Sequence, residues 1–310
     1  MTIDTSGYQS KHLLCAVSGG ADSMCLLHLL KSSGIKVTAA HFEHGIRGEE
    51  SVRDMDFVKA YCEANSIPFV CARGDVPAYA KAKGMSIEEA ARALRYAFLE
   101  EQCSLLGCDY IATAHNADDN AETVLMNLIR GSGAKGLSGI PRSRGKLIRP
   151  LLDVSRSEIE AYIRKNNIPF VEDSTNLSQD YTRNFIRHRI LPLVREINPN
   201  FTQAACRTAE LMRRDDSCLE LMCEDFLKKH RRSDGSIACH ELLSIPEALS
   251  SRVLRELLPG LKMEHVDSIL DFCLPDAIYY ALNEQTTKED TDKVVTPLSV
   301  SSFVVCSFSA

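Results

Sequence analysis

Leu13-Leu14-Cys15-Ala16-Val17-Ser18-Gly19-Gly20-Ala21-Asp22-Ser23-Met24-Cys25-Leu26-Leu27 is an apolar run that two glycines interrupt. Its first part predicts a buried strand over Leu13–Val17, and its second part predicts a helix over Ser23–Lys31. Glycines at such a junction let the backbone approach an anion closely, and the helix adds unpaired N–H groups and a positive dipole end. Ser18 and Ser23 add hydroxyl donors, and a carboxylate at Asp22 beside phosphate indicates a bound magnesium ion. The stretch therefore predicts a phosphate-binding loop, and an ordinary Gly-rich turn is the alternative.

This segment carries neither of the two common nucleotide-binding patterns. It has no G-x-x-x-x-G-K-S/T loop and no G-x-G-x-x-G fingerprint. Its Ser-Gly-Gly-x-Asp-Ser pattern resembles the PP-loop of ATP pyrophosphatases, which cut ATP between the α- and β-phosphates and transfer AMP to an oxygen of the substrate. The resemblance implies that ATP is bound by Ser18, Gly19, Gly20, Ala21, Asp22 and Ser23.

Size and composition are those of an ordinary globular chain. Its 310 residues are 45% apolar, which predicts one large or two modest domains. The apolar stretches are strand-sized rather than membrane-spanning, and Met1–Ser6 lacks a basic or apolar leader pattern, so we expect a cytoplasmic protein. The 12 cysteines are dispersed without any C-x-x-C pair, which favours reduced core thiols over a metal site.

The formal net charge of −6 hides local clusters of basic residues. Together they predict one electropositive face, and ordinary solvated surface is the alternative for any single cluster. The three clusters are Arg142, Arg144, Lys146 and Arg149; Arg183, Arg187, His188 and Arg189; and Lys228, Lys229, His230, Arg231 and Arg232.

Strand and helix patterns alternate through about the first 180 residues, which predicts an α/β fold, a parallel sheet with helices on both faces. Ligands bind such sheets beyond the carboxyl ends of the strands, so the loops after Val17, His41 and Ala114 are expected to line one crevice. Capping boxes at Ser86–Glu89 and Ser155–Glu158 predict the starts of two helices. The expected elements are strands at 13–17, 36–41, 67–71 and 109–114, helices at 23–31, 51–65, 86–106, 120–130 and 155–167, and a further helix-to-strand transition at 168–171.

The character of the chain changes near residue 198. A long amphipathic helix is expected from Asn198 to about His230, followed by short helices and no evident strand before the tail. The predicted organisation is a domain over 1–197 that carries the PP-loop, a smaller helical appendage over 198–282 and an unassigned tail over 283–310.

Two motifs carry further chemistry. His115, Asp118, Asp119 and Glu122 follow the strand 109–114, where paired carboxylates can hold magnesium or accept a proton. Helix capping by Asp118 or Asp119 is the alternative. Arg92 and Arg95 share one face of the helix 86–106, from which an arginine could clamp the α-phosphate; an ordinary surface helix is the alternative.

Five motifs, in this order, make the chain similar to the tRNA(Ile)-lysidine synthase family over residues 12 to 200. The Asp-Ser-Thr-Asn to Arg-Asn-x-Ile-Arg pattern makes the match specific, since the PP-loop alone identifies a superfamily. The motifs are Ser18–Ser23, His44–Ser51, Glu89–Tyr96, Ala114–Thr123, and Glu172–Asn176 leading to Arg183–Arg187.

The resemblance implies an ATP-dependent carbon–nitrogen ligase. The family joins free L-lysine to C2 of the wobble cytidine, position 34, of the isoleucine tRNA with a CAU anticodon, and it releases AMP and diphosphate. The implied cofactors are ATP and Mg²⁺, with Asp22 as a metal ligand, and a homodimer is left open. The implied catalytic residues are Asp22, Asp118, Asp119, Arg92 and Arg95, and the implied substrate- or tRNA-binding residues are His44, Arg47, Glu122, Asn176, Arg183, Asn184 and Arg187.

Other readings of the same loop stay open. A tRNA 2-thiolation enzyme of the superfamily normally needs paired cysteines, and an ammonia-dependent amide-forming synthetase would act on a small molecule. A nucleotide-binding sensor without catalysis would leave Asp118, Asp119 and Glu122 unexplained. At Glu43 relatives often carry Asn or His, and the region after Cys273 differs from the strand-rich C-terminal module of longer members.

Overall fold

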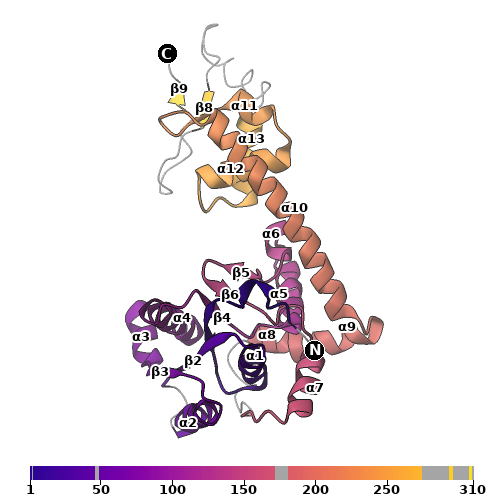
Figure 1. The fold of residues 1–310 in the computed structure, drawn as a ribbon. Coiled ribbons are helices and arrows are strands. Elements are labelled where there is room, and N and C mark those ends of the chain that lie inside the picture. Colours follow the sequence, from indigo (N-terminus) through magenta and orange to yellow (C-terminus); the bar gives the residue numbers. More distant parts are fainter. Residues whose placement is uncertain (2, 46–48, 172–180, 274–292, 296–306, 309–310) are drawn as a thin grey trace, which may run out of the picture. The chain divides into compact units, whose positions relative to one another are not determined.

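The computed structural model describes residues 1, 3–45, 49–171, 181–273, 293–295 and 307–308, and the chain separates into two units, 1–213 and 214–310. The first unit contains the predicted parallel sheet (Figure 1). Its strands are β1 (His12–Ala16), β2 (Lys36–Glu43), β3 (Phe69–Arg73), β4 (Tyr110–Ala112), β5 (Ser143–Arg144) and β6 (Leu147–Ile148). Its helices are a 3₁₀ turn (Ser6–Tyr8), α1 (Ala21–Ser32), α2 (Glu49–Ala64), α3 (Val76–Lys83), α4 (Ile87–Leu105), α5 (Ala117–Ile129), α6 (Ala134–Leu137), α7 (Arg156–Asn166), α8 (Tyr181–Phe185), a π-helical turn (Ile186–Ile190) and α9 (Leu191–Ile197).

The strand order β3-β2-β1-β4-β6-β5 reverses direction at β1. Strands β3, β2, β1, β4 and β6 are parallel, and only β5 is antiparallel to its neighbour. In an open α/β sheet the two loops beside such a reversal diverge and leave a ligand-binding crevice. Here those loops follow β1 and β4, and they carry the Gly-rich segment and the His115–Asp119 motif.

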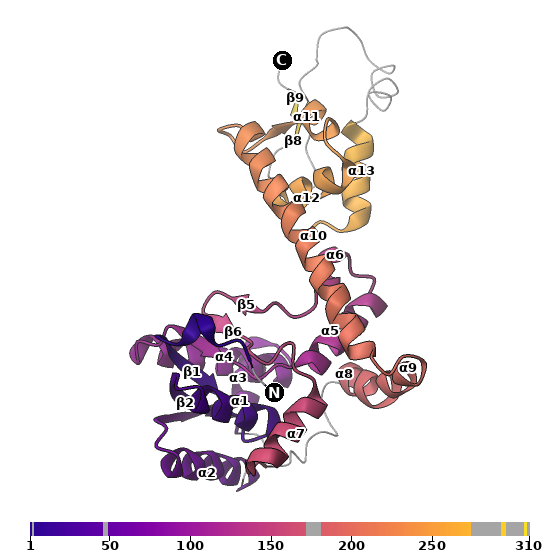
Figure 2. The ribbon, with the colours of Figure 1, turned by 45° about the vertical axis from the view of Figure 1, so that its right-hand side comes forward.

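Successive side chains along β1 and the residue after it point alternately to the two faces of the sheet. Leu13, Cys15 and Val17 are buried in one hydrophobic cluster with α1, α2 and α7, while Leu14 is buried in another with Phe98 and Leu99 of α4. Figures 1 and 2 show α1, α2 and α7 on one side of the sheet and α4 on the other. The prediction of helices on both faces is therefore confirmed.

Both predicted capping boxes form. The Ser86 hydroxyl accepts the Glu89 N–H, and the Glu89 carboxylate accepts the Ser86 N–H; Ser155 and Glu158 make the same reciprocal pair at α7. These local signals fixed where the two helices begin.

The predicted strand at residues 168–171 is wrong, because this segment has no regular structure. Ile168 packs into the core beside α1, and the only backbone bond that the segment makes to the Gly-rich loop is Val171 N–H to Gly19 O, at 2.9 Å. A single such bond does not make a ladder. Sequence analysis also did not predict α3, α6, α8, α9 or the β5–β6 hairpin, which lies where a basic loop was expected.

The second unit has its own core. The long predicted helix is confirmed as α10 (Phe201–His230), whose later residues belong to this unit. Its other elements are β7 (Ile237–Ala238), α11 (Cys239–Leu243), α12 (Glu247–Leu257), α13 (Met263–Cys273), β8 (Lys293–Val295) and β9 (Ser307–Phe308). Buried Val253, Leu254 and Val266 centre its hydrophobic cluster. β7 corrects the expectation of no strand before the tail, since it pairs antiparallel with β8. No described helix is long and apolar enough to cross a bilayer.

Candidate active site

A cavity of about 820 Å³ opens at the carboxyl ends of β1, β2 and β4. It confirms the predicted crevice, because residues following each of these strands line it. Its described wall consists of Ala16, Val17, Ser18, Gly20, Ala21, Asp22, Ser23, Ala40, Phe42, His44, Arg95, Leu99, Thr113, Ala114, His115, Asp119, Arg156, Glu160, Ile163, Arg164, Phe170, Val171, Arg183 and Arg187.

The Gly-rich loop is held in shape by its own serines. The Ser23 hydroxyl donates to Gly20 O at 2.9 Å and accepts the Ser18 N–H at 3.2 Å. Gly19 has φ +95°, a conformation that side chains rarely adopt, and Gly20 precedes α1 without a side-chain cap. The first N–H groups of α1 therefore have no side-chain cap at the loop, as anion binding requires.

Asp22 is the charged residue of this loop. Its Oδ2 accepts a hydrogen bond from Arg156 Nη1 at 2.6 Å, and its Oδ1 is buried without a hydrogen-bond partner among the described residues. Burial raises the pKa of Asp22 to about 6, and the positive charge of Arg156 opposes that rise. A cation at this carboxylate is thus electrostatically favoured.

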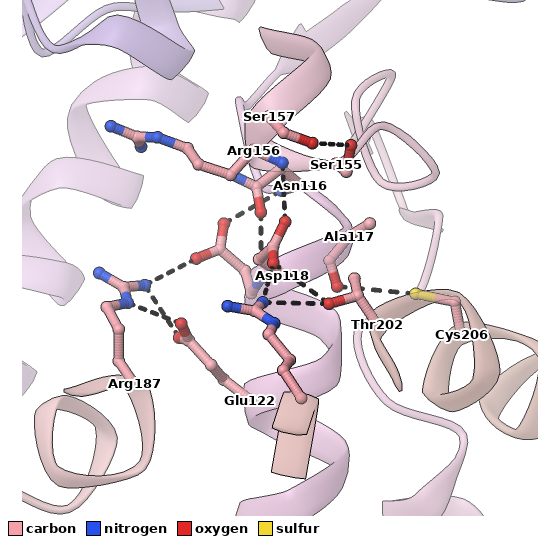
Figure 3. A network of polar contacts seen from close by, with 12 residues as sticks. Asn116, Ala117, Asp118, Glu122, Ser155, Arg156, Ser157, Arg187, Thr202 and Cys206 are labelled. Carbon is pink, nitrogen blue, oxygen red and sulfur yellow. Dashed lines mark hydrogen bonds and ion pairs between the residues drawn. The ribbon is translucent and has the colours of Figure 1, made fainter. Parts of the chain in front are cut away.

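The two neighbouring aspartates at the start of α5 face different surroundings. Asn116 is the N-cap of this helix, and Asp119 completes its capping box by accepting the Asn116 N–H at 3.0 Å. Asp119 also lines the cavity, whereas Asp118 does not. Asp118 instead accepts the Arg156 N–H at 2.7 Å and contacts Arg195 of α9 and Thr202 of α10 (Figure 3). The N-cap is Asn116 rather than either aspartate, but Asp119 does take part in capping this helix, as the acidic residue of the box.

An arginine from the π-helical turn joins two acidic residues of α5. Arg187 Nε donates to Glu122 at 2.6 Å, and its Nη2 donates to Asp119 at 3.1 Å (Figure 3). The Glu122 side chain is only 2% exposed, and burial raises its pKa while the hydrogen bond from Arg187 lowers it. Arg183 adds a hydrogen bond to Thr123 at 3.0 Å. Arg183 and Arg187 line the cavity, while Glu122 lies behind them.

The two predicted arginines of α4 are separated by the fold. Arg95 lines the cavity, and burial lowers its pKa. Arg92 is exposed and does not line it; its guanidinium lies 4.9 Å from the centre of the Tyr96 ring. Their shared helical face therefore brings only Arg95 to the site.

His115 lies in the cavity wall, and its Nδ1 is 3.1 Å from the Thr113 hydroxyl. Burial lowers the pKa of His115 to about 4; Arg149, Arg95 and Arg92 lower it further, and Asp119 opposes them. The imidazole is therefore neutral near pH 7. The sequence motif contained this residue without assigning it a role.

The remaining predicted residues are distributed as follows. His44 lines the cavity beside Phe42, with ring centres 5.1 Å apart. Asn184 lies on α8 outside the wall, and Arg47 and Asn176 lie outside the described residues.

The predicted single electropositive face is not supported by two of its members. Arg149 is 6% exposed and donates to the Pro141 carbonyl, and Arg142 forms an ion pair with Asp153. The charge of Arg149 is directed into the first unit, whereas the exposed charge of Arg142 is balanced at the surface by Asp153.

Sequence reasoning missed the contribution of α7. Arg156, Glu160 and Arg164 lie in the cavity wall, at spacings that put them on neighbouring turns. The capping box marked the beginning of this helix, and Arg156 sits inside that box. Nothing in the local pattern relates it to Asp22, which is 134 positions away.

The residues fit a magnesium ion that arrives with a nucleotide. Asp22 offers a buried oxygen without a hydrogen-bond partner in the described chain, and Asp119 is near enough to raise the pKa of Asp22. Magnesium commonly binds one or two carboxylates together with substrate phosphates. Among the described residues, no group of three or more His, Cys, Asp or Glu side chains is arranged to hold a metal by itself.

Comparisons with known proteins agree on one relationship. The chain is 40% identical over 282 residues to a tRNA(Ile)-lysidine synthase of Geobacillus kaustophilus, covering 84% of this chain and 60% of the relative. It is 45% identical over 226 residues to that of Thermotoga maritima, covering 72% of this chain and 54% of the relative. It is 37% identical over 292 residues to that of Porphyromonas gingivalis, covering 93% of this chain and 64% of the relative. The chain thus spans between about half and two thirds of the length of these relatives.

A solved structure shares the fold. A U34-tRNA thiolase from Methanococcus maripaludis superposes with a TM-score of 0.56 at 22% identity, covering 66% of this chain and 73% of the thiolase. The family model described as a PP-loop domain matches residues 2–194, well over half of the chain. Together with the Gly-rich loop at the reversal of the sheet, this match shows that the chain belongs to the PP-loop domain family.

Proposed function

We propose that this chain ligates free L-lysine to C2 of the cytidine at position 34 of the isoleucine tRNA with a CAU anticodon. ATP would be consumed, and AMP and diphosphate released. The observation that carries the proposal is that the Gly-rich loop, Asp119, Arg95 and Arg187 all line one cavity. The printed names of the relatives point to the same reaction. Such a reaction would take place in the cytoplasm.

ATP binding is assigned to the loop that begins α1. We assign its backbone N–H groups and the Ser18 hydroxyl as donors for the phosphates, and Ser23, whose hydroxyl donates to Gly20 O, as the residue that would reach a phosphate after leaving that contact. Asp22, with Asp119 beside it, would hold magnesium, which when bound supplies positive charge to the phosphate oxygens.

The first chemical step activates a poor leaving group. The C2 oxygen of cytidine attacks the α-phosphorus, the bond to the β-phosphate oxygen breaks, and diphosphate leaves. Negative charge on the α-phosphate oxygens grows in the transition state, and Arg95 is the cavity arginine that we assign to neutralise it. Arg92 is exposed outside the cavity wall, so we assign it no direct contact.

The second step needs an uncharged amine. The lysine side chain has a pKa of about 10.4, so most of it is protonated at neutral pH. We assign Asp119 as the base because it lines the cavity, whereas Asp118 does not. The amine nitrogen then bonds to C2, the C2–O bond breaks, and AMP leaves with that oxygen.

Binding of lysine and tRNA is assigned to the remaining motif residues. We assign Arg187, which lines the cavity, to the carboxylate of the amino acid, and Glu122, which lies behind the wall and bonds to Arg187, to orienting that guanidinium. Arg183, Asn184, His44, Arg47 and Asn176 complete the proposed substrate contacts, and the helical region from residue 198 is the proposed tRNA-binding appendage.

One assay tests this proposal against its competitors. The purified chain is incubated with MgATP, labelled lysine and unmodified isoleucine tRNA carrying a CAU anticodon. We expect label in the tRNA and one AMP per lysine incorporated. Sulfur incorporation from a sulfur donor, a small-molecule amide product, or ATP binding without turnover would each overturn the proposal.

Binding of the tRNA is tested separately, because the chain is shorter than its relatives. Phosphate contacts release counterions, so the affinity for tRNA should fall steeply between 50 and 200 mM salt, by roughly tenfold or more. An affinity independent of salt would contradict a basic tRNA-binding surface.

A further inference from the structure

Asp22 and Arg156 form an ion pair across the mouth of the Gly-rich loop. Arg156 Nη1 lies 2.6 Å from Asp22 Oδ2, and both side chains line the cavity. The pair joins the second residue of α1 to the first residue of α7. The carboxylate that best fits a metal therefore already has a cation as its partner.

The backbone of Arg156 is anchored, but its side chain is accessible. Its N–H is held by Asp118 at 2.7 Å, while its side chain extends away from Asp118 and is 48% exposed (Figure 3). Its Nε also donates to Glu160 at 3.2 Å, one helical turn along α7. Rotation about the side-chain bonds can thus move the guanidinium without moving the helix.

A divalent cation and the guanidinium compete for the same carboxylate. Positive charges a few ångströms apart repel each other even near a protein surface. When a metal occupies Asp22, Glu160 still accepts from Nε of Arg156, but the Nη1 group that leaves Asp22 needs another acceptor, and phosphates bound at the adjacent loop would lie in the same cavity. A planar guanidinium matches phosphate oxygens with two parallel hydrogen bonds.

We propose that Arg156 is a diphosphate-binding residue that exchanges Asp22 for the β- and γ-phosphates when the metal–nucleotide complex enters the cavity. It would stabilise the leaving group of the adenylation step and return to Asp22 when diphosphate departs. This inference rests on the proposed function only for the identity of the leaving group.

The test measures two affinities that should move in opposite directions. Arg156→Ala removes the competitor of the metal, so binding of Mn²⁺ alone, measured by electron paramagnetic resonance, should tighten about tenfold. The same substitution removes the phosphate contact, so binding of magnesium diphosphate, measured by calorimetry, should weaken about tenfold or more. Loss of a merely structural contact would weaken both affinities or neither.

Matched variants keep the interpretation clear. Lys165→Ala removes an exposed positive charge from the same helix outside the cavity wall, and it should leave both affinities unchanged. Arg156→Lys should restore part of the diphosphate affinity, because it keeps the charge but loses the two-pronged geometry. If Arg156→Ala weakens Mn²⁺ binding, or leaves diphosphate binding intact, the inference is wrong.

These measurements contain no lysine and no tRNA. Opposite shifts together with a failed lysine-ligation assay would overturn the proposed function and leave the role of Arg156 standing. Successful lysine ligation without the opposite shifts would support the proposed function and overturn the role of Arg156.

Discussion

Asp118 and Asp119 are neighbours in the chain with different partners, so their loss should have different consequences. Asp119→Asn keeps the shape of the side chain but removes the proposed base, so lysine ligation should fall at least a hundredfold. Asp118→Asn weakens the hydrogen bond from the backbone N–H of Arg156 and removes the ion pair with Arg195, and it should cost about 1–3 kcal/mol of stability. Single-turnover assays and urea unfolding of both variants measure the two effects. Loss of turnover in Asp118→Asn at unchanged stability would contradict the assignment.

The buried imidazole of His115 makes a prediction about pH. Its pKa in the folded protein is about 4, below the ordinary value of 6.5, so between these values the unfolded chain binds a proton that the folded chain does not. The free energy of unfolding is therefore unaffected by the titration of His115 above pH 6.5. It decreases as the pH falls from 6.5 toward 4, by no more than about 1.4 kcal/mol per pH unit.

Urea unfolding at pH 7.5 and pH 5 measures this effect. The loss of stability on acidification should be smaller in His115→Gln than in the unsubstituted protein. His188→Gln, which removes an exposed histidine of the π-helical turn, serves as the control and should leave the loss unchanged. An equal loss in His115→Gln would show that this imidazole is not kept neutral.

At the scale of elements, the turn that follows α6 is locked onto α5. Gly139 has φ +66°, and a Cβ there would lie 2.3 Å from Asn120 Oδ1. That oxygen accepts the Ile140 N–H at 2.8 Å, and Asn120 is buried. Gly139→Ala should therefore combine backbone strain with a broken buried hydrogen bond and cost roughly 2–4 kcal/mol.

Gly131 is the matched control for this substitution. It also has positive φ, +73°, but nothing lies within 4 Å of its Cβ position. Gly131→Ala should cost only the strain, about 1 kcal/mol. If urea unfolding showed equal losses of stability for the two variants, the contact with Asn120 would not contribute to the cost of Gly139→Ala.

At the scale of the whole molecule, the two units have separate hydrophobic cores. Leu254 is fully buried in the cluster formed by α11, α12, α13 and the later part of α10. Leu254→Ala should destabilise the second unit by about 2–5 kcal/mol, because it leaves a cavity in that core. Hydrogen exchange should accelerate in α12 and α13, while exchange in β1, β2 and β4 and the affinity for MgATP stay unchanged. Weakened MgATP binding would show that the nucleotide site depends on the second core.

Local patterns determined much of this protein in advance. The strand, glycines and helix around Ser18–Ser23, the capping boxes at Ser86 and Ser155, and the long helix ending at His230 follow from residues within a few positions of each other. Hydrogen bonds between residues three or four positions apart and alternating burial are properties of the local backbone. The parallel sheet and its crevice followed from the order of these elements.

Tertiary structure alone decided which chemical groups face the cavity. Asp119 rather than Asp118 lines it, Arg95 rather than Arg92 reaches it, and Arg156 bonds to Asp22 across 134 positions. It also left residues 168–171 out of the sheet and buried Arg149. Local periodicity says only that a side chain can point to one face of its element. What that face meets depends on packing between distant segments, which no local pattern encodes.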